Sequence, residues 1–264
     1  MPIAPLPNVD LFYTDSGAGV PILWLQGLGA EHSAWAPQIA RFSVDFRCIA
    51  PDARDVGQSS RASQSYSLAT LADDCAHLLA YLQLEAVHVV GLSLGGAVAQ
   101  HLALNHPNLV RTLTLVSTFA RQSPRQRELL IAWREIYARV DVATFYRQAA
   151  AWMFSDAFFE RPRNLQNVLR YVAESDHPQE AAAFARQVDA VLSHDVVGRL
   201  SEISRPTLIL GGDHDQLAPL AMMQTLADNI TDSQLMTFTG SAHLINLERQ
   251  IDFNRCLYEF IMKH

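Results

Sequence analysis

Short apolar runs alternate with helix-like segments along most of this chain, and this alternation limits the possible folds more than any other feature. The expected strands are brief, are built mostly from Val, Ile, Leu and Thr, and end near Gly, Pro or Asp. They cover residues 22–26, 47–50, 86–92, 112–117, 207–211 and 234–238. Strands that are apolar on both faces are typical of a parallel sheet covered by helices. The pattern therefore predicts an α/β chain with a mostly parallel, doubly wound sheet and helices on both faces.

One segment between the expected strands has a clear helical period. Apolar side chains recur at steps of three and four from Leu68 to Leu82, which marks one buried face. Ser67 directly precedes this stripe and is placed to cap the helix.

The strand pattern stops after Phe119 and resumes at Pro206. Residues 121–198 are expected to form consecutive helices, inserted as a cap at one edge of a core made of residues 1–120 and 199–264. The insertion is rich in aromatic residues, and Trp133, Trp152 and Phe154 are candidates for lining a substrate pocket. Packing within the insertion is the alternative for each of them.

Composition excludes several classes of protein. Of 264 residues, 49% are hydrophobic, which supports a sizeable core, and 20 Lys and Arg against 27 Asp and Glu give a net charge of −7. Nucleic acid is not an expected partner, because phosphate binding needs a positive surface. The apolar runs are far shorter than the roughly 20 residues of a membrane span. Three scattered cysteines without a C-x-x-C pair suggest buried thiols, and the chain is expected to be soluble and cytoplasmic.

The most specific motif is Gly91-Leu92-Ser93-Leu94-Gly95, which follows an expected strand and opens an expected helix. A strand-to-helix turn this tight strains its middle residue and requires small neighbours. Ser93 is thereby predicted to be a nucleophile exposed at the carboxyl edge of the sheet. The alternative, that Ser93 only caps a helix, is weakened by the strand before it and the helix after it.

A serine nucleophile needs a general base, and the base needs an acid that orients it. His243 follows the strand expected at 234–238 and should emerge at the same edge of the sheet as Ser93. Asp215 follows the strand expected at 207–211, and Asp213, two residues earlier, is the alternative acid.

Together these residues resemble the α/β-hydrolase superfamily over nearly the whole chain. The resemblance includes Gln26-Gly27-Leu28-Gly29, Pro51-Asp52-Ala53-Arg54, the serine motif, the G-x-x-D-x-x-x-P stretch and the late histidine. The Gly-Leu-Ser-Leu-Gly-Gly and His-Leu-Ile-Asn-Leu-Glu segments are similar to small bacterial esterases and lactonases of the 3-oxoadipate enol-lactonase type. The resemblance implies an α/β-hydrolase fold with a helical cap, and its spacing favours Asp215 as the acid.

The resemblance also implies an oxyanion hole formed by the backbone N–H groups of Leu28 and Leu94. Two positions depart from the family pattern, with Gln26 where His is usual and Asp55 where Gly is usual. Backbone donors survive such changes, so a hole is still expected. Gln26 is a candidate substrate-binding residue if it points into the pocket, and otherwise it hydrogen-bonds the loop.

No cofactor is expected. The chain has no G-x-G-x-x-G after a strand and no G-x-x-x-x-G-K-[ST], the motifs that bind nucleotides. Its histidines do not stand at the spacing of a metal site, so no metal is expected either.

These observations predict a cofactor-independent serine hydrolase that cleaves a small-molecule carboxylic ester or lactone. The same three residues could instead serve carbon–carbon bond hydrolysis, perhydrolysis, or a lyase or cyclase step, because a fold does not fix a reaction. A ligand-binding receptor on this fold is a further alternative. Nothing in the sequence indicates an oligomeric state.

Overall fold

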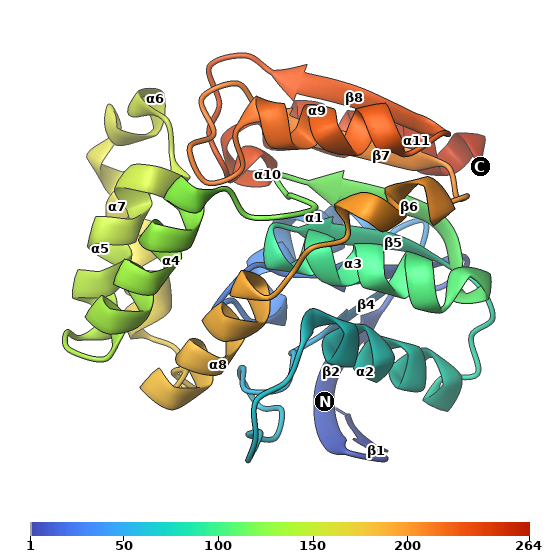
Figure 1. Ribbon diagram of the computed structural model, residues 1–264, viewed down its shortest axis with the longest axis horizontal. Coiled ribbons are helices and arrows are strands. Elements are labelled where there is room, and N and C mark those ends of the chain that lie inside the picture. Colours follow the sequence, from blue (N-terminus) through green and yellow to red (C-terminus); the bar gives the residue numbers. More distant parts are fainter. Residues whose placement is uncertain (1) are drawn as a thin grey trace.

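The protein is described by a computed structural model that covers residues 2–264. An eight-stranded sheet with the order β1-β2-β4-β3-β5-β6-β7-β8 forms its centre (Figure 1). The strands are β1 (Ile3–Leu6), β2 (Val9–Ser16), β3 (Pro21–Leu25), β4 (Arg47–Pro51), β5 (Val87–Leu92), β6 (Val110–Val116), β7 (Thr207–Gly212) and β8 (Ser233–Phe238). From β4 to β8 across the sheet all neighbours are parallel, which confirms the predicted architecture.

The sheet also contains a part that the sequence did not reveal. Strand β1 pairs antiparallel with β2, and β2 pairs antiparallel with β4. The six strands expected from the sequence all occur, with ends shifted by no more than a few residues.

Helices cover both faces of the sheet, as predicted. Helices α2 (Leu68–Tyr81), α3 (Leu94–Asn105) and α9 (Leu220–Asn229) pack on one face, and α1 (Ala36–Phe42) and α11 (Gln250–Lys263) pack on the other. Alternation along β3 divides its side chains accordingly, since Leu23 belongs to the first hydrophobic cluster and Trp24 to the second. Ser67 caps α2 as expected, because its hydroxyl accepts a hydrogen bond from the Thr70 N–H. Short elements complete the core: 3₁₀ helices η1 (His32–Trp35), η2 (Pro107–Leu109) and η3 (Val197–Glu202), and helix α10 (Ile245–Glu248).

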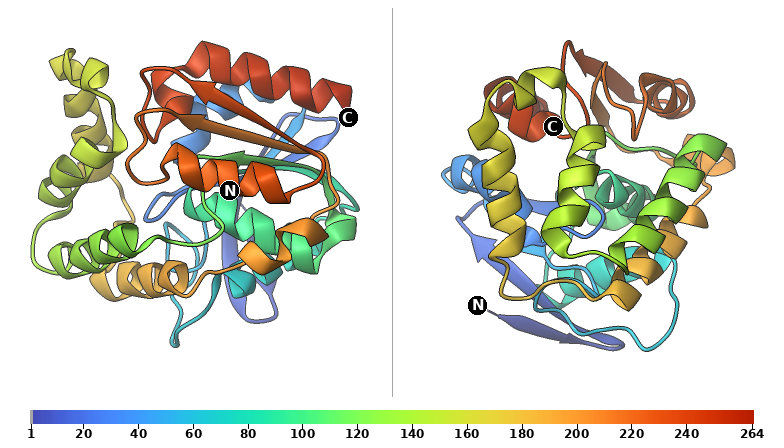
Figure 2. Two further views of the ribbon diagram at one scale, coloured as in Figure 1. Left: turned by 45° about the horizontal axis from the view of Figure 1, so that its top comes forward. Right: turned by 90° about the vertical axis from the view of Figure 1, so that its left-hand side faces the viewer.

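Five helices lie between β6 and β7, at the end of the sheet where the parallel strands finish (Figures 1 and 2). They are α4 (Pro124–Tyr137), α5 (Val142–Met153), α6 (Asp156–Phe159), α7 (Pro162–Ala173) and α8 (Ala181–Leu192), and we call them the α4–α8 segment. Trp133 and Phe184 of this segment belong to the same hydrophobic cluster as Leu23 of the sheet. The division into a core and a separate cap therefore stays a prediction.

None of the helices within residues 2–264 combines the length and the apolar character that crossing a bilayer requires.

Candidate active site

Ser93 occupies a sharp turn between β5 and α3. Its backbone has φ 54° and ψ −115°, a conformation that costs a non-glycine residue energy and occurs mainly at functional sites. The turn is held by the Ser93 N–H, which donates to the Val116 carbonyl at 2.9 Å. The Ser93 carbonyl accepts from the Thr118 hydroxyl at 2.6 Å and from the Ala97 N–H at 3.1 Å.

The glycines around Ser93 are needed because the backbones approach closely. A Cβ atom on Gly95 would lie 2.3 Å from the Leu25 carbonyl oxygen, and one on Gly91 would lie 2.4 Å from the Gly95 oxygen. Neither contact is possible for a side-chain carbon. The G-x-S-x-G spacing thus lets α3 start directly against β3 and β5, with Ser93 at the apex of the turn.

His243 and Asp215 form a buried pair beside this turn. His243 Nδ1 lies 2.8 Å from Asp215 Oδ2, and both side chains are almost fully buried. The other carboxylate oxygen, Oδ1, accepts the N–H groups of Leu217 at 2.8 Å and Ala218 at 2.9 Å. A carboxylate only accepts, so Nδ1 carries the proton of this bond and leaves Nε2 as the basic nitrogen.

Asp213 has a different environment. Its carboxylate accepts the Gly240 N–H at 2.7 Å, and it lies 4.0 Å from His214 rather than close to His243. Geometry therefore pairs His243 with Asp215. The His243 loop is further held by the end of α5, because the His243 N–H donates to the Met153 carbonyl at 3.1 Å.

Ser93 and His243 line one cavity of about 220 Å³. Leu28 and Leu94 also line it, and Leu94 is the first residue of α3, whose N–H has no partner within the helix. Most of the remaining wall is apolar and comes from the α4–α8 segment. The sequence analysis expected this segment to line a substrate pocket; that this cavity holds the substrate stays a prediction.

Of the four residues that were candidates for contacting the substrate, two line the cavity and two do not. Trp133 and Phe154 line the cavity, whereas Trp152 and Gln26 do not. Trp152 lies on α5 with the Arg125 guanidinium 5.8 Å from its ring centre. The Gln26 amide instead donates to the Pro51 carbonyl, which is the loop contact that the sequence analysis kept open. For Gln26 and Trp152 the structure thus favours the alternatives that the sequence left open, a loop hydrogen bond for Gln26 and packing within the insertion for Trp152.

Several polar residues in the cavity wall were not foreseen from the sequence. Gln122 lines it from the segment just before α4 and Gln126 from the first turn of α4, and Glu31 and Tyr171 line another part. The residues of α4 that line the cavity follow a helical step: Gln126, Leu129, Leu130, Trp133 and Tyr137. This spacing was the available signal, but a glutamine on an otherwise apolar stripe is easily assigned to the surface.

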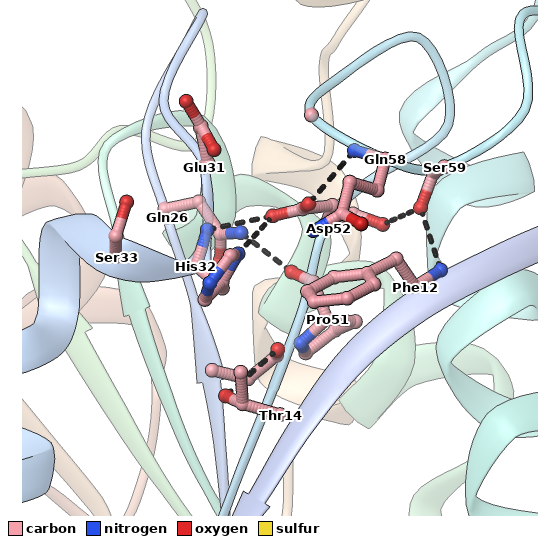
Figure 3. Close-up of polar contacts among 12 residues, drawn as sticks. Phe12, Thr14, Gln26, Glu31, His32, Ser33, Pro51, Asp52, Gln58 and Ser59 are labelled. Atoms are coloured by element: carbon pink, nitrogen blue, oxygen red, sulfur yellow. Dashed lines mark hydrogen bonds and ion pairs between the residues drawn. The ribbon is translucent and has the colours of Figure 1, made fainter. Parts of the chain in front are cut away.

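One polar cluster near the cavity has the composition of a metal site. Single ligand atoms of Glu31, His32 and Asp52 lie within 4.8 Å of one another (Figure 3). However, Asp52 already accepts the N–H of His32 at 2.7 Å and that of Gln58 at 3.1 Å. His32 Nδ1 lies 2.8 Å from the same Asp52. These bonds fasten η1 to Asp52, which directly follows β4.

Comparison with known proteins identifies the family. The family described as alpha/beta hydrolase fold matches residues 20–250, and the chain belongs to it. A protein of Azorhizobium caulinodans named as a carbamate hydrolase, RutD, is 29% identical over 268 residues, which cover 98% of each chain. The solved enol-lactonase from Burkholderia xenovorans LB400 is 26% identical with a TM-score of 0.88, covering 99% of this chain and 100% of that one. An esterase from Thermogutta terrifontis is 25% identical with a TM-score of 0.88, covering 100% of this chain and 99% of that one. The chain is accordingly a member of a family of hydrolases.

Proposed function

We propose that this chain is a serine hydrolase that cleaves a small-molecule carboxylic ester or lactone without a cofactor. The observation that carries the proposal is the 2.8 Å contact between His243 Nδ1 and Asp215, next to a cavity that Ser93 also lines. The similarity to a solved enol-lactonase and a solved esterase supports the substrate class.

In the proposed reaction the Ser93 hydroxyl attacks the substrate carbonyl carbon and gives its proton to His243 Nε2. The negative charge moves to the carbonyl oxygen, which the N–H groups of Leu28 and Leu94 stabilise, commonly the largest electrostatic contribution in such reactions. His243 then donates the proton to the leaving oxygen, and an acyl-enzyme forms. Water, deprotonated by His243, releases the acid and restores Ser93. Asp215 holds the tautomer of His243 and stabilises its charged form.

A carbamate is the second candidate substrate, because the relative from Azorhizobium caulinodans is named for that activity. The same three side chains would attack a carbamate carbonyl in the same way. A panel that sets p-nitrophenyl esters of increasing acyl length beside lactones and carbamates ranks the two candidates by kcat/KM.

The proposal is tested by Ser93→Ala. The variant should lose turnover by a factor on the order of 10⁶ and should not react with a fluorophosphonate, which labels activated serines. Circular dichroism of both proteins serves as the control for folding. A folded variant that keeps more than a few per cent of wild-type turnover would exclude Ser93 as the nucleophile.

A further inference from the structure

The charge on the cavity wall is uneven. Among residues 2–264, no lysine or arginine lines the cavity, whereas one acidic residue, Glu31, does. The rest of the wall is apolar or carries neutral hydroxyl and amide groups, apart from His243 and an exposed histidine, His177. A ligand in this cavity therefore meets one acidic side chain and no permanent cation.

Two arginines that share hydrogen-bond networks with this region are fully occupied. Arg186 of α8 binds Asp55 through two parallel hydrogen bonds of 2.8 and 2.7 Å. Arg54 binds Asp74 in the same way, at 2.7 and 2.6 Å. Bidentate pairs of this kind satisfy both charges. Neither guanidinium is free to compensate a negatively charged ligand.

Glu31, in contrast, forms no ion pair with a lysine or arginine among residues 2–264, and its nearest basic group is the His32 ring, which is hydrogen-bonded to Asp52. It follows the Leu28–Gly29 turn, is half-buried, and accepts a hydrogen bond from the Ser175 hydroxyl at 2.7 Å. The nearby His32 ring directs its Nδ1 to Asp52, not to Glu31 (Figure 3). No ion pair of Glu31 occurs within the part of the chain that the structure describes.

The tyrosines of the wall add no further charge. Burial raises the pKa of Tyr137 and Tyr146 above the ordinary value, and the pKa of Tyr171 is raised as well, so all three hydroxyls are neutral at working pH. Among the described residues that line the cavity, Glu31 is then the one that carries a carboxylate.

We infer that the site selects uncharged esters or lactones against substrates that carry a carboxylate, and that Glu31 is the specificity-determining residue. A carboxylate that leaves water for so small a cavity loses much of its hydration, and pairing with a cation is what would offset that loss. Here it gains no such pair and is repelled by Glu31. The inference rests on the proposed function, because it concerns the substrate of that same reaction.

The test compares two esters of equal length. One is p-nitrophenyl pentanoate, and the other is the mono-p-nitrophenyl ester of glutaric acid, whose carboxylate replaces the terminal methyl group. Methyl p-nitrophenyl glutarate is the control for added polar atoms without charge. The assay is run at about pH 7.5, where carboxylates are ionised. After subtraction of spontaneous hydrolysis, kcat/KM should be at least about 100-fold higher for the pentanoate than for the ester that carries the carboxylate. The methyl ester should stay near the pentanoate.

Glu31→Gln should narrow this preference by roughly tenfold, mainly by raising kcat/KM for the charged ester. That is the scale of repulsion between unit charges about 10 Å apart at an effective dielectric constant of about 20. Ser175→Ala is the matched control, because it removes the hydrogen bond to Glu31 and keeps the charge. It should leave the preference in place.

The outcomes separate the two claims. Hydrolysis of both esters within about threefold of each other by the wild type would overturn the inference and leave the serine hydrolase proposal standing. Equal effects of Glu31→Gln and Ser175→Ala would also overturn it, since position and not charge would then matter. If neither ester is cleaved and no fluorophosphonate label appears, the proposed function fails and the inference fails with it.

Discussion

At Ser93 and at Asp55 the backbone takes left-handed conformations that are unusual for residues other than glycine, with φ 54° and 73°. Asp55 stands where the family usually has Gly, and it tolerates the conformation because its side chain is fully engaged. Its carboxylate accepts the Ala62 N–H at 2.8 Å and binds Arg186. Asp is one of the few residues whose short polar side chain permits this geometry. The departure from the family pattern thus ties the loop after β4 to α8.

The pairing of His243 with one of two nearby aspartates leads to a direct prediction. Asp215→Asn should lower kcat by a factor on the order of 10⁴, because an amide in that position favours the wrong tautomer of the histidine. Asp213→Asn should have a small effect, since Asp213 only accepts the Gly240 N–H. Steady-state kinetics of both variants on one ester decide the matter. A larger loss for Asp213→Asn would move the acid to that residue.

Residue types and spacing predicted the sharp turn at Ser93 because the requirements of that turn are local. Gly91, Ser93 and Gly95 reflect clashes between adjacent backbones, and such clashes leave a fixed spacing in the sequence. The partners of Gln26 and Trp152 depend instead on which distant groups lie nearby, namely the Pro51 carbonyl and Arg125. Spacing contains no information about such contacts, so it could not choose between a loop contact and a pocket contact for Gln26, or between packing and pocket lining for Trp152.

At the scale of elements, the first two strands, β1 and β2, were not predicted because their sequences lack a clear strand pattern. Strand β2 (Val9–Ser16) has buried residues at its start and polar residues at its end, and β1 (Ile3–Leu6) is short and contains Pro5. Neither shows the continuous apolar run that marks β5, all of whose residues are buried. Strand β1 is an edge strand with one neighbour, and β2 lies between β1 and β4, so short length and interspersed polar residues, not an apolar run, characterise this part of the sheet.

Helix α4 offers an element-scale prediction about selectivity. Trp133 lines the cavity and packs edge-on against Phe145, while Trp152 on α5 lies outside the cavity wall. Trp133→Leu should therefore shift the preference between short and bulky acyl groups by about 1–3 kcal/mol in transition-state free energy. The measurement is kcat/KM across a p-nitrophenyl ester series.

Trp152→Leu is the matched control for that experiment. It should change all members of the series by a similar factor, because the side chain does not contact the cavity. A uniform change in the Trp133 variant as well would mean that this residue serves stability and not selection.

For the whole molecule, two histidines are buried in the interior of the fold. His88 lies in the middle of the sheet on β5, is 2% exposed, and its Nδ1 lies 2.7 Å from the Thr112 hydroxyl on β6. Burial lowers the pKa of His88 from 6.5 to about 4. His194, which contacts His101 at 3.1 Å, is buried beside α3, and its pKa is also lowered to about 4, mainly by burial. Both histidines are thus held neutral by the fold.

These two histidines predict acid sensitivity of the fold. Between about pH 4 and 6.5 the unfolded chain binds their protons and the folded chain does not, so the free energy of unfolding rises with pH in that window. Their contribution to the free energy of unfolding is complete above about pH 6.5 and falls, as the pH drops to about 4, by roughly 3 kcal/mol for each residue.

Urea unfolding at several pH values measures the slope of the free energy of unfolding against pH. His88→Asn should reduce that slope by up to about 1.4 kcal/mol per pH unit whatever its effect on absolute stability. His177→Gln, at an exposed position, controls for the removal of a histidine as such. If the His88 variant kept the full wild-type slope, His88 would not be the buried neutral group that the burial of β5 requires.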